Sequence, residues 1–474
     1  MSVDRPRTLR ELRESGHRPS TVKEELRRNV IAKLRAGEPI LPGIVGYDDT
    51  VVPQLVNALL SKHDILLLGL RGQAKTRIIR SLPLLLDEFT PTIAGAELRD
   101  DPMAAQFRES RGIVERQGDD TPVHWVHRDE RYNEKLATPD VTIADLIGEI
   151  DLVKHAEGRH LSDESILHFG LVPRSNRGIF AINELPDLPP RIQVGLLNLL
   201  EERDVQIRGF AVRLNLDLCV VFSANPEDYT NRGRIITPLK DRIGSVIRTH
   251  YPQRVEQAID ITKQNAWLVR GDGEYTVVIP RFMHEIIEEM VRLARESPHI
   301  NQQSGVSVRT SIAATESMVS NAERRAILTG ERRVVPRISD LPNVSASCRG
   351  KLELMLADDE RAEDKLITAL LGEAVKNVFA NHADANALEG IVAAFSDRKA
   401  TLEVGDEIAS DNLADAMNKI EGLKSAAAGV CRHNDLSPED ASNLASAAEF
   451  ILEALYVTNR VTKYAHHGRT YYKR

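Results

Sequence analysis

The residues whose types and spacing first suggest chemistry lie in one short loop, Gly69-Leu70-Arg71-Gly72-Gln73-Ala74-Lys75-Thr76. A bound nucleotide needs backbone N–H groups and a helix N-terminus at its phosphates, an ammonium group beside them, and a hydroxyl for Mg²⁺. The two glycines allow close backbone approach, and Lys75 and Thr76 supply the ammonium and the hydroxyl. The loop therefore predicts a phosphate-binding site. A buried strand followed by an ordinary turn and helix is the alternative.

One position of this loop departs from the usual pattern, which is Gly, four residues, then Gly-Lys-Thr. Ala74 stands where the second glycine belongs. Because alanine adds only a methyl group, we expect the loop to persist with Ala74 at a negative φ.

Two other apolar runs end in polar residues that could act on a nucleotide. Residues 178–184 end in Asn183 and Glu184, and residues 218–225 end in Asn225. Together with the run at 64–68 before the loop, they predict parallel strands of one α/β sheet. Ligands bind at the carboxyl ends of such strands, so we expect Lys75, Glu184 and Asn225 to converge.

Helical patterns surround these strands. We expect helices at 50–61, at 76–86 with a bend or early stop at Pro83, and at 190–202, then a hairpin at 205–216. From about residue 280 the chain reads as helical, with later helices near 360–381 and 437–458. Near the start, Thr21 and Glu24 have capping-box spacing ahead of a helix that ends at Gly37, and the mixed charges of residues 1–40 predict a solvated helical arm.

Composition narrows the class of protein. The 474 residues are 42% hydrophobic and only 4% aromatic, which is typical of a globular, helix-rich chain. The net charge of −8 argues against a general nucleic-acid-binding or anionic-membrane-binding surface, and no apolar run approaches the length of a membrane span. Three widely spaced cysteines show no metal-ligand spacing, and the first residues lack an apolar signal core. We therefore expect a cytoplasmic protein with reduced thiols.

With these pieces placed, the chain resembles AAA+ ATPases of the MoxR and magnesium-chelatase ATPase-subunit branch over about residues 41–345. The resemblance is carried by Ile44-Val45-Gly46, the 69–76 loop, Asn-Arg-Gly-Ile-Phe-Ala-Ile-Asn-Glu at 176–184, Ser-Ala-Asn-Pro at 223–226, Pro-Leu-Lys-Asp-Arg-Ile-Gly at 238–244 and Ser-Gly-Val-Ser-Val-Arg at 304–309. It implies an AAA+ P-loop core with a parallel sheet, a helical lid and a mainly helical C-terminal region. The implied boundaries are 1–40, 41–255, 256–345 and 346–474.

The resemblance also implies roles for single residues. ATP would be bound by Val45, Gly46 and the loop residues 69–76, with Lys75 at the β- and γ-phosphates and Thr76 on Mg²⁺. Glu184 would orient or deprotonate the attacking water, and Asn225 would hold that water from the other side. Arg242 would reach a neighbouring subunit's nucleotide as an arginine finger, and Arg309 would contact the γ-phosphate from the lid. Ordinary surface salt bridges are the alternative for both arginines.

Asn183 departs from the resemblance, because relatives have an aspartate there that helps to hold hydrated Mg²⁺. An amide accepts a hydrogen bond but adds no negative charge, so the substitution predicts slower or more Mg²⁺-dependent hydrolysis. The leading expectation is an ATP-driven remodelling protein that forms a ring, expected to be a hexamer, and works with a von Willebrand factor A domain partner. The alternatives are the motor subunit of a magnesium chelatase and a nucleotide-responsive scaffold with little turnover.

Overall fold

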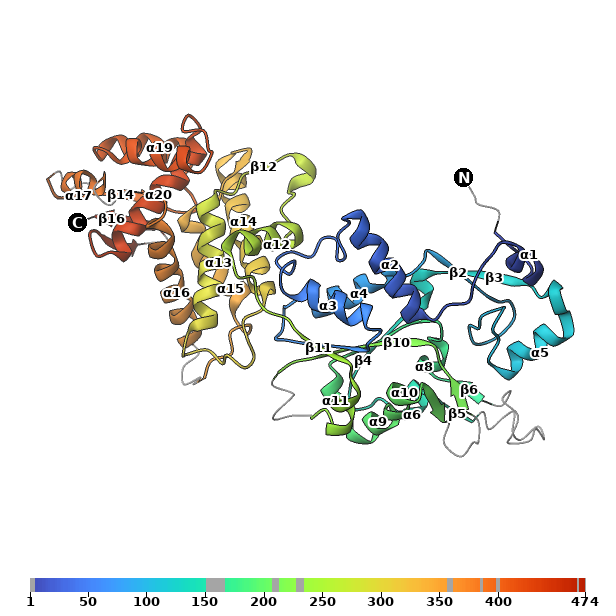
Figure 1. Cartoon of the computed structure of the whole chain (residues 1–474). Helices are drawn as coiled ribbons and strands as arrows, with labels where there is room; N and C mark the ends of the chain where they lie inside the picture. The colour runs from blue at the N-terminus through green and yellow to red at the C-terminus, as the bar shows by residue number, and fades with distance from the viewer. Residues whose placement is uncertain are drawn as a thin grey trace. The chain divides into compact units, whose positions relative to one another are not determined.

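A computed structural model of the chain describes residues 5–150, 167–206, 213–226, 234–355, 361–383, 387–397, 401–466 and 469–473. The chain forms two compact units, Met1–His250 and Tyr251–Arg474. In Figure 1 the first unit runs from blue to green and the second from yellow-green to red. The boundaries expected at residues 40, 255 and 345 stay predictions.

The first unit is built on a five-stranded sheet in the order β11-β1-β10-β7-β4. All four neighbouring pairs are parallel. The strands are β1 (Ile65–Leu68), β4 (Tyr132–Leu136), β7 (Gly178–Asn183), β10 (Leu218–Ala224) and β11 (Ser245–Arg248). The predicted α/β class with a parallel sheet is confirmed by this arrangement.

The three central strands are buried on both faces, as near-continuous apolar runs require. Alternate residues of each strand enter different cores. In β7, Phe180 and Ile182 join one core, and Ile179 and Ala181 join the other. Helices cover both faces (Figure 1), with α2, α3 and α4 on one side and α8, α9, α10 and α11 on the other.

The α-helices in the described part of the first unit are 4 to 15 residues long. They are α1 (Leu9–Glu14), α2 (Val22–Ala36), α3 (Val51–Leu60), α4 (Lys75–Ser81), α5 (Arg108–Gln117), α6 (Ile143–Leu146), α8 (Leu171–Arg174), α9 (Pro190–Gly195), α10 (Leu197–Glu201) and α11 (Thr237–Arg242). Short strand pairs complete the unit: β2 (Phe89–Ile93) with β3 (Val123–His127), β5 (Gly148–Ile150) with β6 (Leu167–Phe169), and β8 (Asp204–Gln206) with β9 (Arg213–Asn215).

Three expectations about these elements have an outcome in the structure. Helix α4 ends at Ser81 and a 3₁₀ turn at Leu82–Leu85 carries Pro83, as expected from a residue that cannot continue an α-helix. The single helix expected over 190–202 is wrong, because α9 ends at Gly195 and α10 begins at Leu197. The Leu196 N–H donates to the Gln193 carbonyl, a tighter 3₁₀-type bond that interrupts the α-helical ladder beside a glycine. Antiparallel pairing of β8 and β9 confirms the predicted hairpin, whose Arg208-Gly209 centre lies outside the described residues.

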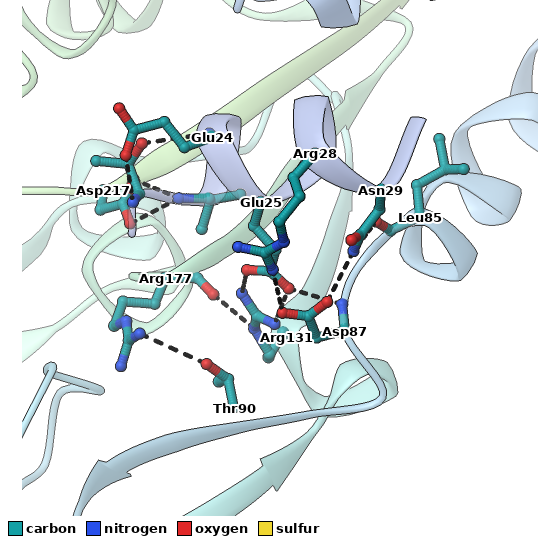
Figure 2. Close-up of polar contacts among 12 residues, drawn as sticks. Glu24, Glu25, Arg28, Asn29, Leu85, Asp87, Thr90, Arg131, Arg177 and Asp217 are labelled. Carbon is teal, nitrogen blue, oxygen red and sulfur yellow. Dashed lines mark hydrogen bonds and ion pairs between the residues drawn. The ribbon is translucent and has the colours of Figure 1, made fainter. Parts of the chain in front are cut away.

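Helix α2 is not the solvated arm that its charges predicted. The Thr21–Glu24 capping box and the Gly37 C-cap are present as expected, but Val22, Leu26 and Val30 are buried in the core beside β1. Beneath the helix, Figure 2 shows the Glu25 carboxylate facing the Arg131 guanidinium, with two hydrogen bonds of 2.8 and 2.7 Å.

The beginning of α2 is also fixed by hydrogen bonds to residues beneath the helix. The Val22 N–H donates to both carboxylate oxygens of Asp217, at 3.1 and 2.9 Å. The Arg131 Nε donates to the Arg177 carbonyl, and the Asp87 N–H donates to Glu25. Residues from four distant segments take part in this network, so α2 is part of the first unit's packing.

The second unit is mainly helical. Its elements are α12 (Val255–Asn265), β12 (Thr276–Val277), α13 (Arg281–Glu296), α14 (Val308–Thr329), β13 (Arg333–Val334), the 3₁₀ helix Ile338–Val344, α15 (Ser345–Cys348), α16 (Ala362–Phe379), α17 (Ala387–Asp397), β14 (Leu402–Val404), α18 (Ser410–Ala416), α19 (Leu423–His433), α20 (Ala441–Val457), β15 (Thr462–His466) and β16 (Arg469–Lys473). One apolar core extends from Phe282 to Tyr472, with α20 almost wholly buried inside it.

Within the described parts of the chain, no helix is both long and apolar enough to cross a membrane. The three cysteines are free and buried, and burial raises the pKa of each thiol, to about 12 for Cys219 and about 11 for Cys348 and Cys431. They are therefore packing residues with little thiolate character at neutral pH.

Candidate nucleotide-binding site

The loop between β1 and α4 has the strand–loop–helix geometry expected for phosphate binding. Gly72 has φ +76°, a conformation that glycine adopts freely. Ala74 has φ +54° and ψ +14°, so the expectation of a negative φ is wrong. The loop keeps its left-handed turn at this position even though the residue is an alanine, at a cost of about 1–2 kcal/mol for a residue with a Cβ.

Gly69 is needed because the backbone is crowded where β1 ends. A Cβ at this position would lie 1.9 Å from Thr249 Oγ1 and 2.3 Å from Gln73 Oε1. Those two atoms belong to one hydrogen-bonded group, in which Gln73 Oε1 accepts from the Leu70 N–H at 2.8 Å and from Thr249 Oγ1 at 2.9 Å. The Gln73 side chain thus fixes the first half of the loop from inside.

A tyrosine fixes the second half. The buried Tyr47 hydroxyl lies 2.9 Å from the Gln73 carbonyl and 2.8 Å from the His250 carbonyl, and its ring meets the His250 ring edge-on. Tyr47 directly follows Val45 and Gly46, of which Gly46 adopts φ +84°. This segment therefore lies next to the loop, as the predicted nucleotide contacts of Val45 and Gly46 require.

Lys75, Asn225 and Glu184 are brought together in one chain of hydrogen bonds. Lys75 is buried, and its Nζ donates to the Gly69 carbonyl at 2.5 Å and to Asn225 Oδ1 at 2.7 Å. Asn225 Nδ2 donates to Glu184 Oε2 at 2.9 Å. The loop and the ends of β10 and β7 thus meet at the carboxyl edge of the sheet, where parallel α/β sheets bind ligands.

The backbone of Glu184 is strained in the way that functional residues often are. Its φ of +54° and ψ of +48° place it in the left-handed region at the end of β7. The turned backbone directs its N–H to Ser223 Oγ at 3.1 Å, while its carboxylate meets Asn225. A turn at this residue takes the carboxylate out of the strand's alternation and towards the neighbouring strand end.

Asn183 is held from two sides. Its Nδ2 donates to Glu134 Oε1 at 2.5 Å, and its Oδ1 accepts from Ser223 Oγ at 3.1 Å. Arg80 of α4 donates to both oxygens of Glu134, at 2.8 and 3.0 Å, and these bonds are the main cause that lowers the pKa of the Glu134 carboxyl. Burial raises the pKa of Tyr132, whose hydroxyl also bonds Glu134.

The residues present fit a Mg²⁺-nucleotide. The turn between β1 and α4 has Gly72 at φ +76°, which suits the close backbone approach of a phosphate loop, and the Lys75 ammonium lies buried against this turn. The exposed Thr76, on the first turn of α4, offers a hydroxyl, and Asn183 Oδ1 offers a second neutral oxygen acceptor. Oxygen ligands of this kind suit Mg²⁺, which would neutralise phosphate charge when bound.

The two predicted arginines belong to helices other than α4. Arg242, the last residue of α11, donates from Nε to Glu201 Oε2 at 2.6 Å and from a terminal nitrogen to the Pro238 carbonyl at 2.9 Å. Arg309 belongs to the second unit, where it follows the Ser307 N-cap of α14. Leu70 and Arg71 lie on the loop itself. The nucleotide contacts predicted for these two arginines, and for Leu70 and Arg71, stay predictions.

Comparison with solved structures finds three chains with a weak overall likeness to this one. The chain is similar to a candidate ATPase from Cytophaga hutchinsonii, at 16% identity over 76% of this chain and 97% of that one, with a TM-score of 0.31. It is similar to NtrX from Brucella abortus in complex with ADP, at 11% identity over 93% and 74%, TM-score 0.35. It is also similar to a chain of the BchI–BchD complex of magnesium chelatase, at 20% identity over 68% and 97%, TM-score 0.34.

No family model and no curated protein matches the sequence. Since the structural likenesses are low in identity and in TM-score, the function proposed below depends on the geometry of the site.

Several residues of the site were not among those predicted from the sequence. Tyr47 and Thr249 hold the loop, Ser223 connects Asn183 to Glu184, and Glu134 with Arg80 supports Asn183. Ser223 had a detectable signal, because it lies in the Ser-Ala-Asn-Pro motif at the end of an apolar run. Glu134 had none, because β4 is a polar edge strand whose contact depends on its register with β7.

Proposed function

We propose that this protein binds ATP with Mg²⁺ between the 69–76 loop and the ends of β7 and β10, and hydrolyses it. The observation that carries the proposal is the Lys75–Asn225–Glu184 chain, which joins an ammonium, an amide and a carboxylate from three segments. A phosphoryl-transfer site needs this combination, because catalysis depends on charge neutralisation at the phosphates and on an oriented water.

Each residue would act through its own atoms. Lys75 would exchange its oxygen contacts within the loop for phosphate oxygens, since an ammonium has three donors and prefers anions. Glu184 would accept a proton from the water or orient it, and Asn225, which already bonds Glu184, would hold the water's other side. The strained backbone of Glu184 keeps its carboxylate at this position without side-chain rearrangement.

The finer proposal is a remodelling protein that works as a ring, with six copies the expected number, in the cytoplasm and with a partner carrying a von Willebrand factor A domain. The resemblance of its short motifs to the MoxR and magnesium-chelatase branch supports it. In such a ring Arg242 would complete a neighbour's site, and it would first have to leave Glu201. The pair is partly exposed, so breaking it would cost about 0–1 kcal/mol.

Binding and hydrolysis are tested separately. Titration calorimetry with ATP and Mg²⁺ is expected to show binding by the parent and by Glu184→Gln, and none by Lys75→Ala. Phosphate release is expected from the parent alone. A parent that takes up no ATP would overturn the proposal.

The ring is tested by mixing two inactive variants. Arg242→Ala keeps its own nucleotide site, while Lys75→Ala keeps its arginine. Their mixture is therefore expected to recover part of the parent's ATPase rate if neighbours share sites. A mixture as inactive as its components would contradict the shared site.

A second candidate function is a nucleotide-responsive switch with little turnover, and it is favoured by one observation. Asn183 gives its NH₂ group to Glu134 and offers only a neutral oxygen on its other side. ATP binding by the parent with no phosphate release, over a wide range of Mg²⁺ concentration, would decide for the switch.

A further inference from the structure

The Asn183 amide and the Glu134 carboxylate form a hydrogen-bonded pair. The amide NH₂ group donates to the Glu134 carboxylate on the adjacent strand, while the amide oxygen accepts from the Ser223 hydroxyl. The Asn183 residue is only 5% exposed, so these contacts are shielded from water. Position 183 is where the sequence predicts a metal-facing residue without its usual negative charge.

The surroundings fix the orientation of the amide. A carboxylate can only accept, so it must face the NH₂ group and not the carbonyl oxygen of Asn183. The Ser223 hydroxyl accepts from the Glu184 N–H at 3.1 Å and gives its own proton to Asn183 Oδ1. A flipped amide would set its oxygen against Glu134. The observed orientation therefore presents the Asn183 oxygen beside Ser223.

Glu134 is itself held in place from α4. Both of its oxygens accept from Arg80, and one also bonds the Tyr132 hydroxyl. Arg80 lies four residues after Thr76, one turn along the same helix. The network therefore connects the helix of the predicted magnesium ligand Thr76 to the predicted magnesium contact Asn183. An aspartate at 183 would set two carboxylates against each other.

We propose that Glu134 is the positioning residue of the magnesium side of this site. It holds the Asn183 amide with its oxygen towards Ser223, because from β4 it accepts the hydrogen bond that the Asn183 NH₂ group donates and that an aspartate on β7 could not donate. The proposal rests on the proposed nucleotide-binding function. Carboxylates that orient metal ligands through one hydrogen bond commonly change metal affinity about 10- to 100-fold when they are removed.

The test exchanges the two groups. The variants are Glu134→Gln, Asn183→Asp and the double variant Glu134→Gln/Asn183→Asp, in which an amide and a carboxylate trade places. For each, calorimetry gives the dissociation constant for ADP with Mg²⁺ and with a chelator, and the ratio of the two measures the gain from Mg²⁺. Glu130→Gln, an exposed glutamate four residues earlier, is the matched control.

Glu134→Gln is expected to lower the Mg²⁺ gain about 10- to 100-fold with the affinity in chelator unchanged, because only the magnesium side depends on this carboxylate. Asn183→Asp is expected to lower the melting temperature of the ligand-free protein, because two carboxylates would adjoin. The double variant is expected to recover both the parent's Mg²⁺ gain and its melting temperature. The control Glu130→Gln is expected to match the parent in both. If Glu134 had only a structural role, Glu134→Gln would lower the affinity for ADP equally with Mg²⁺ and with chelator.

The inference is overturned if Glu134→Gln keeps the parent's Mg²⁺ gain, or if the double variant recovers nothing. If Glu134→Gln does not fold, Glu134→Asp keeps the charge and shortens the reach, so a smaller loss of the gain is expected and no loss overturns the inference. A parent that binds ADP in neither buffer would instead overturn the proposed function. The two failures are therefore distinguishable.

Discussion

The buried Glu25–Arg131 pair beneath α2 gives the sharpest test of how the first unit is held together. The Arg131 side chain is fully buried and that of Glu25 is 5% exposed. Glu25→Gln keeps the size of the side chain but sets an NH₂ donor against either the Arg131 guanidinium or the Asp87 N–H, and leaves Arg131 without this carboxylate. Removing one partner of a buried pair costs about 3–5 kcal/mol, because the other charge remains desolvated.

The matched control is on the same helix. Arg28 pairs with Asp87 in an exposed position, with about half of each side chain accessible. Exposed pairs contribute about 0–1 kcal/mol, so Arg28→Gln is expected to change the free energy of unfolding by no more than that. The two variants thus remove the same kind of charge contact from one helix and differ in burial.

Urea unfolding can be followed in the first unit alone. The chain has two tryptophans, Trp125 on β3 in the first unit and Trp267 in the second. In a Trp267→Phe background, the fluorescence of Trp125 therefore reports on the unit that contains α2. If Glu25→Gln costs no more than Arg28→Gln, the reasoning that α2 is docked by a desolvated ion pair is refuted.

Two further predictions concern the loop, and a third concerns Asp217 beside the beginning of α2. Ala74→Gly is expected to raise the free energy of unfolding by about 0.5–1 kcal/mol, since relief of the left-handed strain outweighs the added freedom of the unfolded chain; a lower melting temperature would contradict this. Gly69→Ala is expected to abolish ADP binding in calorimetry because its Cβ would meet Thr249 and Gln73, whereas Gly390→Ala, with nothing within 4 Å, is expected to bind as the parent does. Burial raises the pKa of Asp217 to about 6, so folding takes up a proton and the contribution of this group to stability, at most about 3 kcal/mol, is lost as pH rises from about 4 to 6. In urea titrations of the first unit, Asp217→Asn is expected to reduce the change in the free energy of unfolding over that pH range. An unchanged pH dependence would contradict the attribution of this change to Asp217.

The central part of the site could be predicted because its residues follow uninterrupted apolar runs. Parallel pairing places the ends of such runs at one edge, so the meeting of Lys75, Glu184 and Asn225 follows from hydrophobic pattern and topology together. The α/β class of the first unit and the helical character of the second follow from the same patterns.

What could not be predicted depends on contacts between distant residues. The charges of α2 look like a solvated surface until Arg131 and Asp217, more than 100 positions away, are placed beneath them. The φ of Ala74 is set by the loop's closure and not by the residue type. The support that Glu134 gives to Asn183 requires the β4–β7 register, which a short polar strand does not reveal.

The hydrogen bonds around Tyr47 connect the 69–76 loop to the final residues of the first unit. Gln73 is bonded to Thr249, and one hydroxyl spans the carbonyls of Gln73 and His250, immediately before the backbone enters the second unit at Tyr251. The loop and the joint are therefore connected through the hydrogen bonds of three neutral side chains, Tyr47, Gln73 and Thr249, and salt does not screen such contacts.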